Sequence, residues 1–289
     1  MDAKELLKKV RKIEIKTRGL SQNIFAGEYH SAFKGRGMMF SEVREYQYGD
    51  DIRDIDWNVT ARHNKPFVKV FEEERELTVM LMVDVSGSRL FGAEGVEKRE
   101  MIAEIAATLA FSASQNNDKI GALFFSDKVE KFIPPKKGKK HILLIIRELL
   151  DFEPESKGTD LSVALRYFTD AMRKRSTVFI ISDFIDSHEY RQALSLARNK
   201  HDVMAVQVYD RRDSQLPDVG LMRMTDLETG NTRWVDTGSS RVRKAYAKWW
   251  YDRQQAMSEQ LKKSRVNFTS VATDEDYVKA LMGLFKKRV

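Results

Sequence analysis

Residues 76–88 read ELTVMLMVDVSGS and predict a buried β-strand that ends in a loop of oxygen-bearing side chains. Its almost continuous apolar run is typical of a strand covered on both faces of a sheet. Similar runs occur at residues 176–184 and 202–210, and stretches of helical periodicity separate them. Alternation of this kind indicates βαβ units. We therefore expect residues 76–289 to form an α/β domain with a doubly wound, mostly parallel sheet.

Two regions depart from simple alternation. Residues 213–238, approximately, predict a β-hairpin inserted into the α/β domain. Residues 1–75 are less regular, and we expect them to form a smaller N-terminal accessory region. That region begins with a basic amphipathic helix, with Val10 and Ile13 on its apolar side, which we expect to dock on its own domain.

Composition excludes several classes of function. The chain has 289 residues, a formal net charge of +7 and no cysteine, so disulfides, thiolate catalysis and cysteine-based zinc sites are excluded. It lacks the phosphate-binding motif of P-loop ATPases. No apolar run is long enough to span a membrane, which leaves peripheral contact only. We expect a cytoplasmic protein that is not an enzyme and does not bind nucleic acid.

Oxygen-bearing side chains gather at one end of the predicted sheet. The first strand ends in Asp84, Ser86 and Ser88, another loop carries Thr159, and a later strand ends in Asp183. Sites in open α/β sheets form beyond the carboxyl ends of the strands. Two carboxylates and three hydroxyls suit a hard cation such as Mg²⁺ or Mn²⁺. Taken singly, each of these residues is also typical of a helix cap or a turn.

The five residues together resemble the metal-ion-dependent adhesion site (MIDAS) of von Willebrand factor A domains. The resemblance covers residues 76–289 by the order of predicted elements. It implies a metal ion held by Asp84, Ser86, Ser88, Thr159 and Asp183. Phe184 departs from the pattern, because many such domains have glycine there, and a bulky side chain would narrow access to the metal.

A second resemblance rests on the stretch REYQYGDDIRDIDWNVTARHNKPFVKVFEEE, which follows FKGRGMMFSE. It resembles a bacterial family, the domain of unknown function fifty-eight type, that places this signature ahead of a von Willebrand A core. Members are commonly encoded beside MoxR-type AAA+ ATPases. The resemblance implies an adaptor or substrate-recognition partner of such an ATPase, with chaperone-like action in complex assembly. Other von Willebrand A-containing proteins are further candidate partners.

The signature places several carboxylates beside arginines. We interpret them as a network of ion pairs and turns, with Trp57 as the anchor on the sheet. A candidate docking face is the second interpretation, and its residues are Arg44, Asp50, Asp51, Arg53, Asp56, Trp57 and Arg62. A metal-dependent nuclease or nucleic-acid-binding protein that uses the Asp50–Asp56 cluster and the basic surface is the alternative function. We favour metal-dependent protein–protein contact.

Overall fold

The computed structural model describes residues 3–20, 38–63, 65–73, 77–87, 96–225 and 230–286. The chain divides into two compact units, one made of residues 1–32 and 77–289 and the other of residues 33–76. We call them the sheet domain and the accessory unit. The division differs from the predicted boundary after residue 75, because the first helix belongs with the sheet domain.

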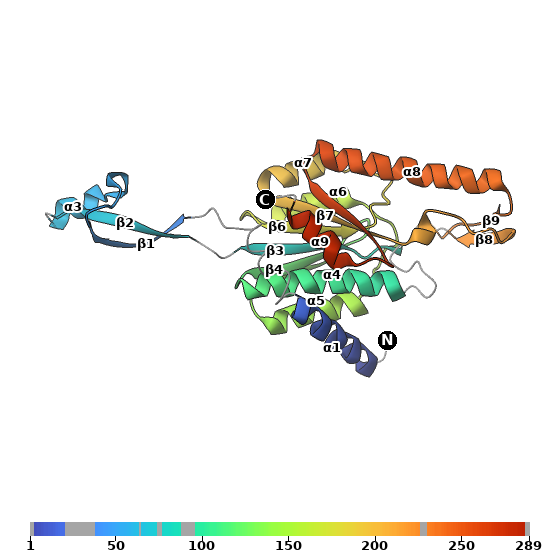
Figure 1. Cartoon of the computed structure of the whole chain (residues 1–289), viewed down its shortest axis with the longest axis horizontal. Coiled ribbons are helices and arrows are strands. Elements are labelled where there is room, and N and C mark those ends of the chain that lie inside the picture. The colour runs from blue at the N-terminus through green and yellow to red at the C-terminus, as the bar shows by residue number, and fades with distance from the viewer. Residues whose placement is uncertain are drawn as a thin grey trace. The chain divides into compact units, whose positions relative to one another are not determined.

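The sheet domain is built on a six-stranded sheet with the order β10-β7-β6-β3-β4-β5 (Figure 1). Five strands run parallel, and the edge strand β5 is antiparallel to β4. The predicted α/β class with a mostly parallel sheet is confirmed. The strands are β3 Thr78–Asp84, β4 Lys119–Phe125, β5 Val129–Lys136, β6 Thr177–Ser182, β7 Asp202–Tyr209 and β10 Asn267–Ala272.

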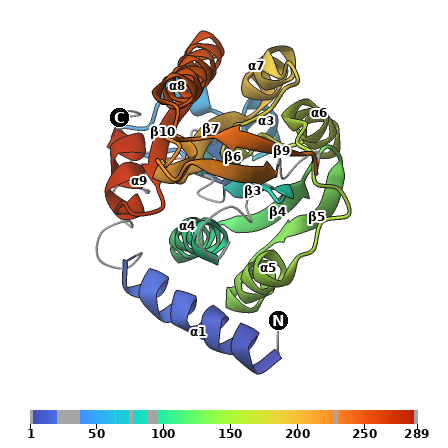
Figure 2. The same cartoon turned by 90° about the vertical axis from the view of Figure 1, so that its right-hand side faces the viewer.

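Helices cover both faces of this sheet, as Figure 2 shows. Apolar side chains of α6, α7 and α8 share one core cluster with β3 and β6. On the other face α4, α5 and α9 pack, and Phe285 of α9 contacts Phe179 of β6 with ring centroids 6.2 Å apart. These helices are α4 Val96–Gln115, α5 Lys139–Asp151, α6 Leu161–Ala171, α7 Arg191–Lys200, α8 Ser240–Lys263 and α9 Tyr277–Lys286.

Helix α1, Ala3–Leu20, lies outside α4 and α5. Val10 and Ile13 are buried, whereas Lys16 pairs with Glu104 of α4 at 2.5 Å. The amphipathic helix thus packs on the protein itself, as expected, but on the sheet domain and not on the accessory region in which the sequence placed it. None of the helices that the structure describes combines the length and the apolar character that crossing a membrane requires.

The predicted hairpin follows β7. After the short helix η4, Arg211–Asp213, strands β8 Leu221–Thr225 and β9 Thr232–Asp236 pair antiparallel. The hairpin forms a separate two-stranded sheet, as an insertion would.

The accessory unit contains a two-stranded antiparallel sheet, β1 Met38–Glu45 and β2 Phe67–Glu73, with η2 Ile52–Asp54 and α3 Trp57–His63 between the strands. Val68 is 3% exposed and is the buried hydrophobic residue among the described side chains of this unit. Such a small unit buries little apolar surface, so polar contacts hold much of its shape.

Candidate metal centre

The three loops that were predicted to form a site all lie at the carboxyl end of the parallel strands. Asp84 is the last residue of β3, and Asp183 follows β6 directly. Thr159 precedes α6. These three side chains and Ser86 are all buried, at most 4% exposed. Ser88, the fifth predicted ligand, lies outside the described residues.

Asp84 is held by its own loop and by the end of the neighbouring strand β6. Its Oδ1 accepts a hydrogen bond from the Ser86 backbone N–H at 2.9 Å, and its Oδ2 accepts one from Ser182 Oγ at 2.7 Å. Burial raises the pKa of Asp84 to about 6, the charge of Asp183 adds to this, and the hydrogen bonds oppose it. Negative charge at this position is therefore costly without a cation.

The Thr159 loop is tied to the first loop through the backbone. Gly87 N–H donates to the Lys157 carbonyl at 3.0 Å. Asp160 caps α6 by accepting from the backbone N–H groups of Ser162 and Val163. This cap fixes the position of Thr159 next to it.

Asp183 has a buried cationic partner that sequence reasoning missed. Lys98 Nζ, from the first turn of α4, lies 2.8 Å from Asp183 Oδ2 and 3.9 Å from Asp213 Oδ2. The Lys98 side chain is 2% exposed. Burial acts to lower the pKa of Lys98, but the charges of Asp183, Asp213 and Asp84 outweigh it and raise that pKa. Lys98 is therefore an ammonium ion inside the site.

Among the residues that the structure describes in this cluster, carboxylates outnumber the ammonium. Asp84, Asp183 and Asp213 are buried and interact electrostatically with Lys98. Burial also raises the pKa of Asp213, although the charge of Lys98 opposes the shift. Oxygen donors with an excess of buried negative charge fit a hard divalent cation. The donor set thus suits the Mg²⁺ or Mn²⁺ that the sequence predicted.

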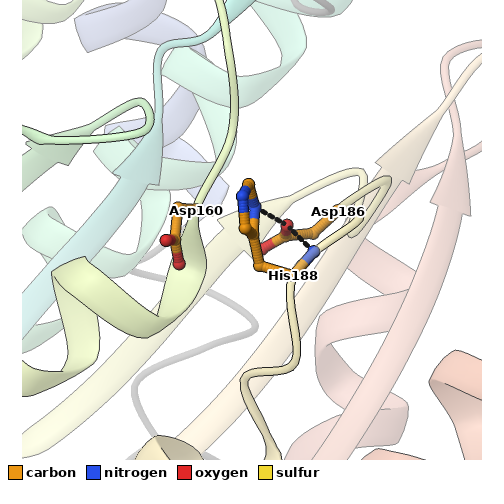
Figure 3. A group of neighbouring side chains, drawn as sticks. All are labelled: Asp160, Asp186 and His188. Atoms are coloured by element: carbon orange, nitrogen blue, oxygen red, sulfur yellow. Dashed lines mark hydrogen bonds and ion pairs between the residues drawn. The ribbon is translucent and has the colours of Figure 1, made fainter.

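A second group with metal-binding composition lies beside the Thr159 loop (Figure 3). Ligand atoms of Asp160, Asp186 and His188 all lie within 4.8 Å of one another. Asp186 accepts from the Leu161 N–H at 2.8 Å, and His188 Nδ1 lies 2.9 Å from Asp186 and 3.0 Å from the Thr159 carbonyl. Asp186 raises the pKa of His188. These contacts brace the loop after β6 against the start of α6.

Phe184 adopts a left-handed backbone conformation, with φ of 57°. Glycine takes this conformation without steric cost, which explains why glycine suits the position in related sites. The Phe184 side chain is 6% exposed and belongs to the core cluster of α6, α7 and α8. Its burial offsets the backbone strain.

The signature residues of the accessory unit form the predicted ion pairs and turns. Arg44 donates two hydrogen bonds of 2.8 Å to Asp50, and Arg53 likewise donates hydrogen bonds to Asp51 from two of its nitrogens. Asp56 accepts from two backbone N–H groups at the start of α3. These contacts lower the pKa of each of the three carboxyls. Such arginine-bound and capping carboxylates do not favour the nuclease alternative.

Two other signature residues are exposed. Trp57 is 68% exposed, and its expected role as the anchor on the sheet stays a prediction. Arg62 lies exposed in the last turn of α3. Ile52 and Tyr48 of the same unit are also largely exposed. The candidate docking face therefore combines apolar side chains with ion pairs.

Comparisons with known proteins give relatives whose functions are uncharacterised. An uncharacterised protein of Mycobacterium tuberculosis is 32% identical over 235 residues, which covers 81% of this chain and 74% of that protein. Uncharacterised protein YeaD of Bacillus subtilis is 28% identical over 109 residues, or 38% of this chain and 25% of YeaD.

The comparison with solved structures also gives matches of low sequence identity. A conserved hypothetical protein BatB from Bacteroides thetaiotaomicron matches with a TM-score of 0.45 and 16% identity, over 73% of this chain and 98% of that one. An aerotolerance-related membrane protein from Bacteroides fragilis matches with a TM-score of 0.48 and 14% identity, over the same shares. The family model for "protein of unknown function DUF58" matches residues 42–256. This chain therefore belongs to the DUF58 family.

Proposed function

We propose that this protein is a metal-dependent protein–protein interaction module. Its metal ion is Mg²⁺ or Mn²⁺, bound at the loops of Asp84, Ser86, Ser88, Thr159 and Asp183. The observation that carries the proposal is the buried excess of carboxylates over ammonium at the carboxyl end of the sheet. Buried charges of one sign require a counter-ion, and hydroxyl and carboxylate oxygens select a hard one.

The chain's own residues prepare the site for such an ion in two ways. Asp84 supplies charge and is held in place by Ser182 and by the Ser86 backbone. The loop of Thr159 is fixed by the Asp160 cap. A bound ion would supply a coordination position for an acidic side chain of a partner protein. Contact of this kind binds a partner without changing it chemically, so we propose no catalytic step.

We propose a MoxR-type AAA+ ATPase as the partner, with this chain as its adaptor or substrate-recognition subunit in the cytoplasm. The support is the resemblance carried by the signature of residues 44–74 together with membership of the DUF58 family. The chain has no phosphate-binding motif of its own, so ATP hydrolysis would be supplied by the other protein.

The test begins with calorimetric titration of Mg²⁺ and Mn²⁺ into the chelator-treated protein. We expect saturable binding with one ion per chain, and loss of that binding in Asp84→Asn. Asp118→Asn is the matched control, because Asp118 is also buried and accepts a backbone N–H, from Leu77, but lies before β4 at the other end of the strands. Equal binding in wild type and Asp84→Asn would contradict the metal site.

The second step is a pull-down with the MoxR-type ATPase from the same organism, with and without chelator. We expect chelator to release the ATPase from wild type, and Asp84→Asn to retain little of it in either condition. Binding that is equally tight in all four conditions would contradict metal-dependent contact while leaving the metal site itself intact.

A further inference from the structure

Lys98 occupies a position between two carboxylates that come from different parts of the fold. Asp183 follows β6, whereas Asp213 ends η4, the short helix that leads into the inserted hairpin. The ammonium is 2.8 Å from Asp183 and 3.9 Å from Asp213, so it bonds the first and faces the second. All three side chains are at most 10% exposed.

The carboxylate of Asp183 would interact with two cations. Asp183 is a proposed ligand of the divalent ion, and the Lys98 ammonium already binds one of its oxygens. Two cations that share one buried carboxylate repel each other strongly, because the surroundings screen their charges poorly. A divalent ion that draws on Asp183 therefore weakens the hold of Asp183 on Lys98.

Asp213 offers Lys98 a second acceptor within easy reach. Shortening 3.9 Å to a normal hydrogen-bond length needs a movement of roughly 1 Å. A lysine side chain makes such a movement readily, since its four-carbon stem is flexible and its ammonium has three donors. Among the described residues, no other buried lysine lies in this cluster.

We propose that Lys98 is a two-position counter-ion. It bonds Asp183 when the divalent ion is absent and Asp213 when the ion is bound. The inference rests on the metal site of the proposed function and adds its regulation: the occupancy of the site is conveyed to η4 and to the start of the inserted hairpin.

The contacts of Asp213 explain why this movement matters. Its carboxylate accepts from the Asp210 N–H at 3.1 Å, and Asp210 in turn accepts from the Arg212 N–H, so the two residues form a capping box around η4. A hydrogen bond from the Lys98 ammonium to Asp213 would join this capping box to α4. Metal binding would thereby stiffen the segment that carries the hairpin away from β7.

A double-mutant cycle on Mn²⁺ affinity tests this inference. Lys98→Met removes the competing charge, and we expect it to strengthen Mn²⁺ binding on the order of tenfold or more. Asp213→Asn removes the negative charge of the second acceptor and should weaken binding on the order of tenfold in the wild-type background. In the Lys98→Met background the same Asp213→Asn change should have a much smaller effect, because no ammonium needs a new partner.

Equal effects of Asp213→Asn in both backgrounds, or weaker Mn²⁺ binding in Lys98→Met, would overturn the inference while the metal site stands. Absence of Mn²⁺ binding in every variant would overturn the proposed metal site and the inference with it. Lys98→Gln keeps a hydrogen-bond donor for Asp183 without the charge, and it replaces Lys98→Met in the cycle if that protein does not fold.

Hydrogen exchange gives a readout that is independent of affinity. The amides of Asp213 and Ser214 donate to backbone carbonyls within η4. We expect Mn²⁺ to slow their exchange severalfold in wild type and to leave it unchanged in Lys98→Met. Slowing of the same size in both proteins would show that the metal acts on η4 without Lys98.

Discussion

Replacing Asp84 by asparagine should stabilise the protein in the absence of metal. The pKa of Asp84 is raised from 3.8 to about 6, chiefly by burial. At pH 7.5 the folded state must therefore hold a charge that the unfolded state holds more easily, at a cost of about 3 kcal/mol. The asparagine amide is neutral and matches the carboxylate in shape. It can still accept a hydrogen bond from the Ser86 N–H, so the substitution removes most of that destabilisation.

Urea unfolding in the presence of chelator measures this effect. We expect Asp84→Asn to have a free energy of unfolding about 1–3 kcal/mol above wild type at pH 7.5. A carboxyl with a raised pKa loses its penalty as the pH falls through that pKa, so the gap should shrink to about 1 kcal/mol or less at pH 4.5. Asp118→Asn, the buried control, should be less stable than wild type by about 1 kcal/mol.

Adding Mg²⁺ reverses the order of the two proteins. A ligand that binds only the folded state stabilises wild type by about 4.1 kcal/mol when its concentration is a thousand times Kd, whereas Asp84→Asn should gain nothing. An Asp84→Asn protein that is less stable than wild type in chelator at pH 7.5 would refute the view that this carboxylate is held at a cost.

Three further predictions concern stability. Burial lowers the pKa of His201 to about 4, so the free energy of unfolding of wild type should fall by up to about 3 kcal/mol relative to His201→Gln between pH 6.5 and pH 4. Urea unfolding across this range measures the difference, and an equal pH dependence in both proteins would contradict it. Phe184→Ala should lower the free energy of unfolding by about 3–5 kcal/mol, and Phe184→Gly should lower it by about 1 kcal/mol less, because glycine relieves the positive φ. Phe184→Gly should therefore melt at the higher temperature of the two, and the reverse order would contradict the prediction. A Cβ at Gly121 would lie 2.7 Å from the Ile133 carbonyl oxygen, so Gly121→Ala should cost about 1–3 kcal/mol in thermal unfolding, and an unchanged melting temperature would count against it.

Most of the fold could be predicted because the parallel strands are buried on both faces. Their apolar runs, such as residues 77–83, stand out from the periodic helices between them. The inserted hairpin was also visible from its turn residues. The membership of α1 in the sheet domain was harder to see, since the 44 residues of the accessory unit separate it from β3 and no local pattern reports a contact over that distance.

The site was predicted only in part. Residue types at strand ends pointed to Asp84 and Asp183, because the ends of parallel strands share one edge. Lys98 was missed because a charged residue in a helix is ordinarily exposed. A signal existed, however: Lys98 is three, four and seven residues before Met101, Ile102 and Ile105, so it shares the buried face of α4.

The accessory unit directly precedes β3 in the sequence. Strand β3 pairs with β4 along one edge and with β6 along the other. Thr78 and Asp84 stand at opposite ends of this strand, about 20 Å apart at 3.3 Å per residue. A strand held on both edges does not pass a displacement from one end to the other, so the two proposed docking surfaces would act as independent modules. A partner that engaged both would gain avidity because one chain carries them, and its affinity would exceed that for either surface alone without any new contact between them.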